Sequence, residues 1–192
     1  MMRKLTLYMT MTLDGFFAGP DGELDWMVQT PDRELTADAV AFFDSIDGGF
    51  IGYPAGIGMI AYWGEVSKNP SAPESERAIA KAVNKLHSIL VSNREEDLGI
   101  PSAELMVVED DDELTQSVTR IKERAGRDLG LAGGIRTAQT FVRLGLIDEY
   151  ILMVHPVTIG NGKRIFTGKT NLELVGVKTY ISGVMRVCYK PR

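Results

Sequence analysis

The chain has 192 residues, of which 44% are hydrophobic and 24% charged, and its formal net charge at pH 7 is −5. This composition is that of an ordinary globular protein, and the length predicts one domain over residues 1–192. The acidic balance argues against nucleic acid or an anionic membrane surface as a partner of the molecule as a whole.

The number and spacing of the cysteine and histidine residues further limit the kinds of site that the chain can form. Cys188 is the only cysteine, and His87 and His155 lack metal-ligand spacing, so we expect neither an internal disulfide nor a bound metal. No apolar run approaches about twenty residues, and the N-terminus lacks the features of a signal peptide. These features predict a soluble, cytoplasmic protein.

The first predicted element is a strand over Leu5 to Thr12, in which apolar and hydrogen-bonding side chains alternate. A loop with turn chemistry follows from Asp14 to Trp26. Thr30-Pro31-Asp32 then begins an amphipathic helix, and we expect Gly48-Gly49 to end it. Phe50-Ile51-Gly52 is predicted to be a short buried strand.

The middle of the chain alternates helices and strands. A proline- and serine-rich loop over Asn69 to Glu76 leads into a helix over Glu76 to Leu86, and Ser88 to Val91 form a strand. A second strand, Glu104 to Val108, precedes the acidic run Glu109 to Glu113, which suits the N-terminus of the next helix.

A strand-helix-strand crossover comes next. The apolar run Leu129 to Ala132 passes through Gly133-Gly134 into a helical pattern that Gly145 closes, and Tyr150 to Val154 form the following strand. This order is typical of a parallel sheet.

The last two predicted strands, Leu172 to Tyr180 and Val184 to Tyr189, form an antiparallel hairpin. The whole pattern indicates an α/β fold: a mostly parallel sheet with helices on both faces and a C-terminal antiparallel hairpin. Its ligand crevice should lie at the carboxyl ends of the strands, where the turns after Ile51, Val91 and Ala132 would form one dinucleotide groove.

Gly133-Gly134 is the sharpest local signal in that groove. Two glycines at a strand-to-helix turn let a ligand approach bare backbone, and the first N–H groups of the helix have no intrahelical partner, so a phosphate would bind well. The alternative is that the glycines only permit a tight turn or close helix-strand packing.

A longer pattern carries a family resemblance. Gly133-Gly134, the run 145–149, Pro156, Gly160, Gly162 and the run 164–166 stand in an order that resembles the C-terminal reductase domain of the bacterial deaminase-reductases of riboflavin synthesis. Those domains share the dihydrofolate reductase-like fold, so the resemblance implies that three-layer sandwich. The chain lacks the zinc motifs of the deaminase half and is similar to stand-alone relatives of the reductase half.

The resemblance implies an NAD(P)H-dependent oxidoreductase that uses NADPH, with NADH as an alternative. Its small-molecule substrate would be a pteridine-like or ribosylaminopyrimidine-like compound, and a homodimer is expected because relatives pair. The competing interpretation is a non-catalytic nucleotide- or small-molecule-binding protein of the same fold.

The resemblance also assigns the cofactor to particular positions of this sequence. Residues beside the nicotinamide would come from the first strand and the loop after it, and the rest of the dinucleotide would follow the three strand-end turns. The residues are Met9, Thr10, Phe17, Ala18, Gly52, Tyr53, Ser92, Asn93, Arg94, Ala132, Gly133, Gly134, Ile135, Arg136 and Thr137. The fold further implies a cis peptide bond within the run 132–134.

Two positions depart from the family pattern. An arginine and a threonine that hold the extra phosphate of NADP usually follow the glycine that matches Gly52, but here Tyr53 and Ala55 stand there. A tyrosine offers one hydroxyl in place of a cationic fork. Either another cation such as Arg94 substitutes, or the protein uses NADH, or the cofactor is lost.

Hydride transfer also needs a proton source. The dihydrofolate reductase-like arrangement would place a catalytic carboxylate at Asp32, with Asp14 and Asp25 as rivals, although each is more commonly a cap or turn residue. Trp26 and His155 are the candidates for substrate contact, and a structural role is the alternative for His155.

Overall fold

The computed structural model describes residues 2–27 and 30–192. Strands and helices alternate through most of the chain, which is the pattern expected of a parallel sheet. In chain order the elements are β1 (Leu5–Thr12), β2 (Phe16–Ala18), α1 (Arg33–Ser45), β3 (Ile46–Gly52), α2 (Ala55–Lys68), α3 (Glu74–Val83), β4 (His87–Ser92), β5 (Ala103–Val107), α4 (Asp111–Glu123), β6 (Asp128–Leu131), α5 (Ile135–Arg143), β7 (Glu149–His155), β8 (Lys163–Arg164), β9 (Leu172–Thr179) and β10 (Met185–Pro191).

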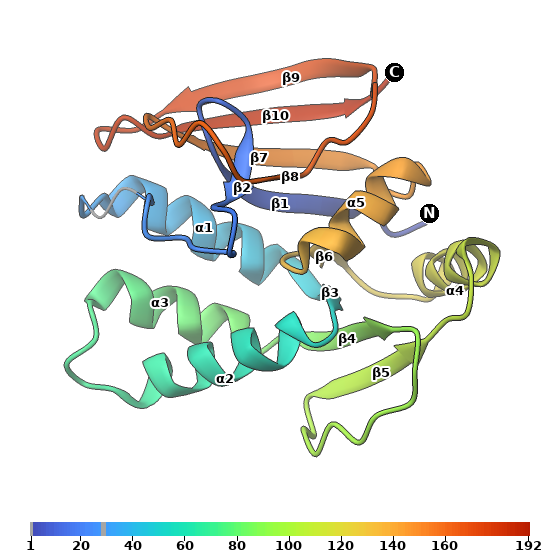
Figure 1. The fold of residues 1–192 in the computed structure, drawn as a ribbon. Coiled ribbons are helices and arrows are strands. Elements are labelled where there is room, and N and C mark those ends of the chain that lie inside the picture. Colours follow the sequence, from blue (N-terminus) through green and yellow to red (C-terminus); the bar gives the residue numbers. More distant parts are fainter. Residues whose placement is uncertain (1, 28–29) are drawn as a thin grey trace.

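Eight of these strands form one sheet in the order β5-β4-β3-β6-β1-β7-β10-β9, as Figure 1 shows. Every neighbouring pair from β5 to β7 is parallel, whereas β10 pairs antiparallel with both β7 and β9. The α/β class, the mostly parallel sheet and the C-terminal hairpin predicted above are therefore confirmed.

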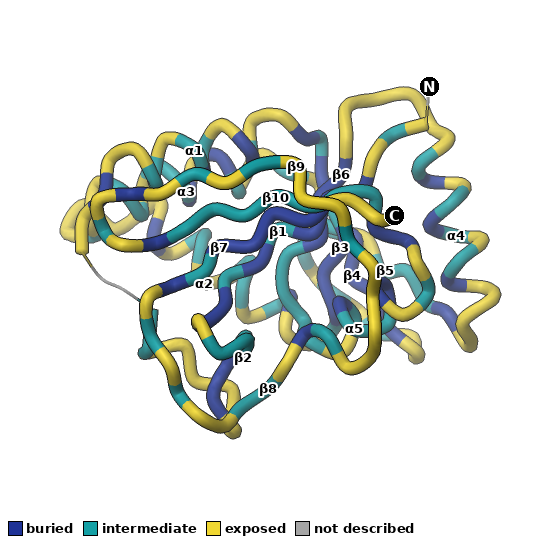
Figure 2. The backbone as a smooth tube through the Cα atoms, turned by 90° about the horizontal axis from the view of Figure 1, so that it is seen from above, coloured by how far each residue is buried: buried dark blue, intermediate teal, exposed yellow. Residues whose placement is uncertain are grey.

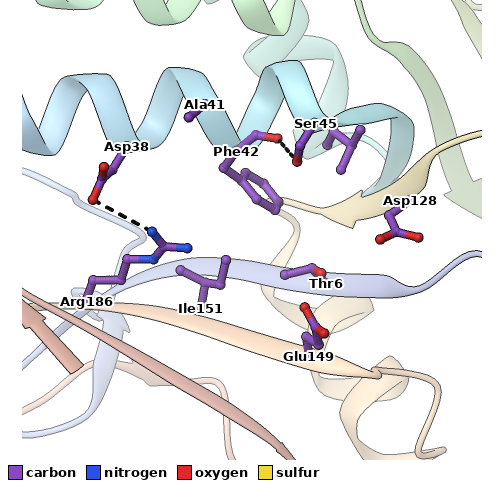
Figure 3. Close-up of a pocket in the computed structure, with 10 residues that line it drawn as sticks. Thr6, Asp38, Ala41, Phe42, Ser45, Asp128, Glu149, Ile151 and Arg186 are labelled. Carbon is purple, nitrogen blue, oxygen red and sulfur yellow. Dashed lines mark hydrogen bonds and ion pairs between the residues drawn. The ribbon is translucent and has the colours of Figure 1, made fainter. Parts of the chain in front are cut away.

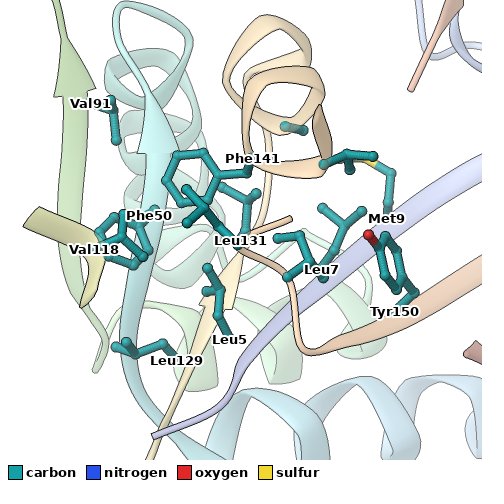
Figure 4. Close-up of a cluster of buried hydrophobic side chains, with 14 of the residues drawn as sticks. Leu5, Leu7, Met9, Phe50, Val91, Val118, Leu129, Leu131, Phe141 and Tyr150 are labelled. Carbon is teal, nitrogen blue, oxygen red and sulfur yellow. The ribbon is translucent and has the colours of Figure 1, made fainter. Parts of the chain in front are cut away.

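Helices cover both faces of the sheet. On one face α4 and α5 pack against the larger core cluster, which includes Phe50 of β3, Phe141 of α5 and Val118 of α4 (Figure 4). On the other face α1 packs through Phe42, whose ring stacks on that of Tyr8 at 4.7 Å. The central strands are accordingly the most buried part of the chain (Figure 2), and they hold the strand ends in fixed positions.

The prediction that Gly48-Gly49 ends the first helix is wrong. The helix ends at Ser45, and both glycines lie inside β3. A Cβ on Gly48 would lie 2.3 Å from the carbonyl oxygen of His87, and one on Gly49 would lie 2.2 Å from that of Gly130. These glycines therefore allow close approach of neighbouring backbones in the sheet.

Three further elements, α2, β2 and β8, were absent from the sequence prediction. The glycine-punctuated segment after Pro54 forms α2, a helix of 14 residues. The loop from Asp14 to Trp26 contains the three-residue strand β2, which pairs antiparallel with β8. No helix in the described ranges is both long and apolar enough to cross a membrane.

Candidate functional site

The carboxyl ends of four neighbouring strands meet at one edge of the sheet. In the order β4-β3-β6-β1, the strands end at Ser92, Gly52, Leu131 and Thr12. The three turns that the sequence analysis singled out follow the first three of these strands. The structure thus brings those turns side by side, as a single groove for a long ligand requires.

Gly52 and Gly134 are in direct backbone contact at this edge. A Cβ on Gly134 would lie 2.7 Å from the amide nitrogen of Gly52, and one on Gly52 would lie 2.3 Å from Oγ1 of Thr137. Close packing, which the sequence analysis kept as the alternative reason for paired glycines, is therefore present.

The turn itself is built from two left-handed residues. Gly133 and Gly134 have φ angles of +92° and +74°, values that residues with a side chain rarely adopt. Each peptide bond from Ala132 to Gly134 is trans, so the expected cis bond at this turn is wrong. The chain passes from β6 into α5 through these two glycines with positive φ angles and without a cis bond.

Two helices begin at these turns without a side-chain cap. The N-cap of α2 is Pro54 and that of α5 is Gly134, and neither residue accepts a hydrogen bond through its side chain. By contrast, Asp32 and Asp110 cap α1 and α4. The helices beside the groove therefore present N–H groups and the positive end of the helix dipole to whatever lies in it.

The remaining residues predicted at the α5 turn take different positions. The amide of Ala132 donates to the carbonyl oxygen of Phe50 at 3.3 Å, which ties the end of β6 to β3. Ile135 packs partly against the main core, whereas Arg136 is exposed. Thr137, in the first turn of α5, holds its hydroxyl beside Gly52.

Tyr53 and Arg94 come together at the mouths of β3 and β4. The guanidinium carbon of Arg94 lies 5.9 Å from the centre of the Tyr53 ring, and the Arg94 Nε lies 2.7 Å from a carboxylate oxygen of Glu96. The hydroxyl of Ser92 donates to the carbonyl oxygen of Arg94 at 2.9 Å, which shapes this turn, and Asn93 is exposed. The Arg94 guanidinium therefore lies beside Tyr53, the position at which the family pattern has an arginine and this chain does not.

The residues predicted beside the nicotinamide ring lie around β1 and β2. Met9 is 2% exposed within the core, and Thr10 is half-buried on the neighbouring position of β1. Phe17 packs partly against the main core cluster, and Ala18 is buried in β2, which β8 pairs with. Pairing with β8 gives this part of the loop a fixed backbone.

Asp14 is held by several hydrogen bonds just after β1. Its carboxylate accepts from the Thr12 hydroxyl at 2.6 Å and from the backbone amides of Gly160 and Ile159 at 2.8 and 3.2 Å. These bonds, that from Thr12 first, lower the pKa of Asp14. The carboxylate is therefore ionised at neutral pH and anchors the loop after β7.

Asp32 lies on the α1 side of the sheet as a helix cap. One carboxylate oxygen accepts from the amides of Glu34 and Leu35, and the other accepts from the amide of Ser182 at 3.0 Å. The bond from Leu35 first, then the bond from the Ser182 amide, lower the pKa of this carboxyl against the opposing effect of burial. The Asp32 carboxylate is thus ionised at neutral pH, and its described hydrogen bonds are those of an N-cap of α1 and of a tie to Ser182.

Trp26 and His155 are in contact. Their rings meet edge to face with centroids 5.5 Å apart, and His155 stands opposite Thr12 in the β1–β7 register. Burial lowers the pKa of His155, so the imidazole is neutral at pH 7. The indole Nε1 of Trp26 is buried and has no hydrogen-bond partner among the described residues.

Two cavities lie at the opposite ends of the strands. The larger, of about 290 Å³, lies between α1 and the sheet (Figure 3). Its lining is Thr6, Asp38, Ala41, Phe42, Ser45, Ile46, Asp128, Glu149, Ile151 and Arg186. The second, of about 160 Å³, is lined in part by Asp47 and His87. Because Asp128, Glu149 and His87 are the first residues of their strands, both cavities are remote from the three turns.

Comparison with known proteins identifies the family. The model of the RibD C-terminal domain matches residues 3–186. The chain belongs to the RibD C-terminal domain family. The family is one of riboflavin-related, NAD(P)H-dependent pyrimidine reductases.

Individual RibD C-terminal relatives agree with this placement. The uncharacterized protein YyaP of Bacillus subtilis strain 168 is 30% identical over 190 residues, which cover 97% of this chain and 94% of YyaP. The deaminase/reductase of Thermotoga maritima has a TM-score of 0.67 at 15% identity, and the alignment covers 100% of this chain and 57% of that one.

The riboflavin biosynthesis reductase Rib7 of Saccharomyces cerevisiae is similar in structure as well. Its TM-score is 0.59 at 10% identity, and the alignment covers 100% of this chain and 90% of Rib7. At such identities the two solved structures establish the fold alone. The dihydrofolate reductase-like fold that the resemblance implied is therefore confirmed.

Proposed function

We propose that this RibD C-terminal domain protein is an NADPH-dependent reductase of a pyrimidine-like or pteridine-like heterocycle. The observation that carries the proposal is the junction of β3 and β6. There two uncapped helix N-termini start from adjacent strand ends, and the Gly52 and Gly134 backbones touch. A diphosphate fits such a site, because free backbone amides and two helix dipoles favour negative charge.

The adenosine end of the dinucleotide would lie toward β4. Ser92 and Arg94 stand there, and Arg94 also faces the Tyr53 ring. A guanidinium can bind a phosphate through two parallel N–H groups, which a tyrosine cannot do. We assign to Arg94 the recognition of the 2′-phosphate, in place of the arginine that the family pattern has at Tyr53. This assignment favours NADPH over NADH.

The nicotinamide end would lie toward β1. Thr10 offers a half-buried hydroxyl on that strand, and β2 brings Phe17 and Ala18 against the same region. When bound, the dinucleotide supplies a hydride to an electron-poor carbon of the substrate. Fixed neighbours on a paired strand hold a flat ring in one orientation, which is the main contribution that a protein makes to such a reaction.

The accompanying proton is assigned to solvent. The pKa values of Asp14 and Asp32 are both lowered by hydrogen bonds, so neither carboxyl holds a proton at neutral pH. A group that is already ionised cannot act as a general acid without first taking up a proton. In this proposal the two aspartates shape the site, and water delivers the proton.

The substrate would contact Trp26 and His155 beyond the end of β1. The buried Nε1 of Trp26 is a hydrogen-bond donor without a described partner, and such groups are uncommon because they lose free energy when unpaired. A ring carbonyl of a pyrimidine or pteridine is a suitable acceptor. The neutral imidazole of His155, in edge contact with the indole, would restrict how that ring can enter.

Titration with NADPH and NADH tests the proposal. Quenching of the two tryptophans, Trp26 and Trp63, should report saturable binding of both, with NADPH the tighter. Arg94→Ala should weaken NADPH binding by about tenfold and leave NADH binding unchanged, since a charge-assisted bond to phosphate contributes roughly 1.5 kcal/mol. Arg120→Ala, which removes an exposed arginine on α4, is the matched control.

Turnover of a pyrimidine precursor of riboflavin or of dihydrofolate, followed as loss of NADPH absorbance, would support a reductase. Failure of both dinucleotides to bind would overturn the proposal. It would favour the alternative of a non-catalytic binding protein with the same fold.

A further inference from the structure

Arg164 of β8 is held through its backbone from two sides. Its carbonyl oxygen accepts a hydrogen bond of 2.6 Å from the side-chain amide of Gln139, on α5. β8 also pairs antiparallel with β2, and Figure 2 shows these two short strands together beside the sheet. The next residue, Ile165, is 1% exposed in the main core cluster. The backbone at Arg164 is therefore fixed between α5, β2 and the core.

The side chain of Arg164 extends to the loop between β1 and β2. One guanidinium N–H donates to the carbonyl oxygen of Asp14 at 2.9 Å, and the guanidinium carbon lies 3.9 Å from the centre of the Phe16 ring. A Cβ on Gly15 would lie 3.0 Å from Nη1 of Arg164. The guanidinium thus lies against three successive residues of this loop, and it restricts both the main chain and the Phe16 ring.

Phe16 depends on this guanidinium for its cover. The residue is 5% exposed, yet it belongs to neither of the two described clusters of buried apolar side chains. A planar guanidinium can stack on an aromatic face and still donate hydrogen bonds in its own plane, which a lysine ammonium cannot do. Arg164 therefore fixes the Phe16 ring and the Asp14 carbonyl group with one side chain.

The loop that Arg164 holds leads directly to the residues assigned above to the nicotinamide. Phe17 and Ala18 follow Phe16 in β2. On the other side of Arg164, α5 begins at the diphosphate site of the proposed function, and its Gln139 binds the Arg164 backbone. Arg164 thus joins the helix that would hold the diphosphate to the strand that would hold the ring.

We propose that Arg164 is a positioning residue for hydride transfer, which fixes β2 so that the nicotinamide ring keeps one orientation. The inference rests on the proposed function, and it gives Arg164 no contact with the dinucleotide or the substrate. In the reaction the substrate carbon gains the hydride and water supplies the proton, while NADPH is oxidised to NADP⁺. A displacement of about 1 Å can slow such a step about 10²-fold. The affinity for NADPH comes from the two phosphate sites and depends far less on Arg164.

Hydrogen exchange without any ligand tests the hold on the loop. Arg164→Met should speed exchange about tenfold at the amides of Gly15 and Phe16, which donate to Thr12, and leave exchange in β3 and β6 as in the wild type. If that variant does not fold, Gln139→Leu decides: it removes the bond to the Arg164 carbonyl and should act in the same direction. Unchanged exchange at both amides in the folded variant would overturn the inference.

Fluorescence of the dihydronicotinamide ring tests the consequence for the cofactor. NADPH bound to the wild type should emit more strongly than free NADPH, because a held ring is shielded from water. Arg164→Met should bind NADPH with a dissociation constant within about threefold of the wild-type value, since both phosphate sites remain. Its bound ring, however, should emit like that of free NADPH. Arg120→Met, at the exposed arginine on α4, should match the wild type in both measurements.

Two results of this titration would count against the account in different ways. Wild-type emission from NADPH bound to Arg164→Met would overturn the positioning role and leave the proposed function standing. A wild-type chain that does not bind NADPH would overturn the proposed function, and the positioning role with it.

Discussion

Asp32, at the start of α1, accepts a hydrogen bond of 3.0 Å from the backbone amide of Ser182, in the turn between β9 and β10. The same carboxylate caps α1 through the amides of Glu34 and Leu35. One side chain therefore joins the first helix to the C-terminal hairpin. This is a structural role at the position where the family resemblance predicted a catalytic carboxylate, and the two roles make different predictions.

Asp32→Ala is expected to lower Tm by roughly 2–4 °C, because the cap and the tie to Ser182 are both lost. Differential scanning calorimetry at pH 7 measures the change. Because the pKa of Asp32 is lowered in the folded chain, its contribution to stability depends on pH. That contribution is fully present above the pKa of the unfolded chain, near 4, and is lost as pH falls through the lower folded value. The variant and the wild type should therefore converge in stability below that pH. An unchanged Tm at pH 7, together with lost turnover, would instead support the catalytic prediction.

Asp14→Asn should loosen the loop after β7. The ionised carboxylate holds the amides of Ile159 and Gly160, and an amide side chain accepts such bonds more weakly. Hydrogen exchange at those two amides should become faster, while exchange in β5 should stay as in the wild type. If exchange is unaltered and only the pH profile of turnover changes, Asp14 acts on the substrate as the sequence analysis predicted.

Gly134→Ala should destabilise the fold strongly. Its φ of +74° costs about 1–2 kcal/mol for a residue with a side chain, and the new Cβ would meet the Gly52 amide nitrogen at 2.7 Å. We expect the free energy of unfolding in urea to fall by about 3 kcal/mol. Gly145→Ala is the matched control, because its φ is +67° and nothing lies within 4 Å of its Cβ. Equal losses in the two variants would contradict the close contact of the two turns.

His155 should make stability depend on pH near neutrality. Burial lowers its pKa below the value of 6.5 in the unfolded chain, so the unfolded state binds the proton first. Stability is complete above about pH 6.5 and declines as pH falls toward the lower folded value. His155→Asn should flatten that part of a Tm-against-pH curve. His87→Asn, at a half-exposed side chain, should leave the decline in place, and a wild-type curve without one would count against burial of His155.

Most of the fold follows from periodicity. The strand over Leu5 to Thr12, the crossover around α5 and the C-terminal hairpin have clear repeats of two or 3.6 residues, and the structure has them as predicted. The first helix was extended too far because Gly48-Gly49 resembles a helix stop. Only the neighbouring strands, whose carbonyl groups approach both glycines, show that these are strand positions.

The helix α2 was missed because three glycines and a preceding proline lower its intrinsic propensity. Met59 lies on this helix, and its Sδ and Cε would lie 3.3 Å from a Cβ on Gly133, a contact that the sequence pattern does not show. The contacts of Asp14 and Asp32 could not be predicted from the sequence either, since their partners Gly160 and Ser182 are more than 140 residues away along the chain. Local patterns do not report such pairs, although they did place the three turns at one edge.

The most direct measurement is a crystal structure of this chain grown with NADPH. The account predicts one dinucleotide across the ends of β4, β3, β6 and β1, with its diphosphate on the amides that begin α2 and α5 and its 2′-phosphate beside Arg94. Density for the dinucleotide in the cavity beneath α1, or turns at Gly52 and Gly134 left without ligand at saturating NADPH, would contradict it.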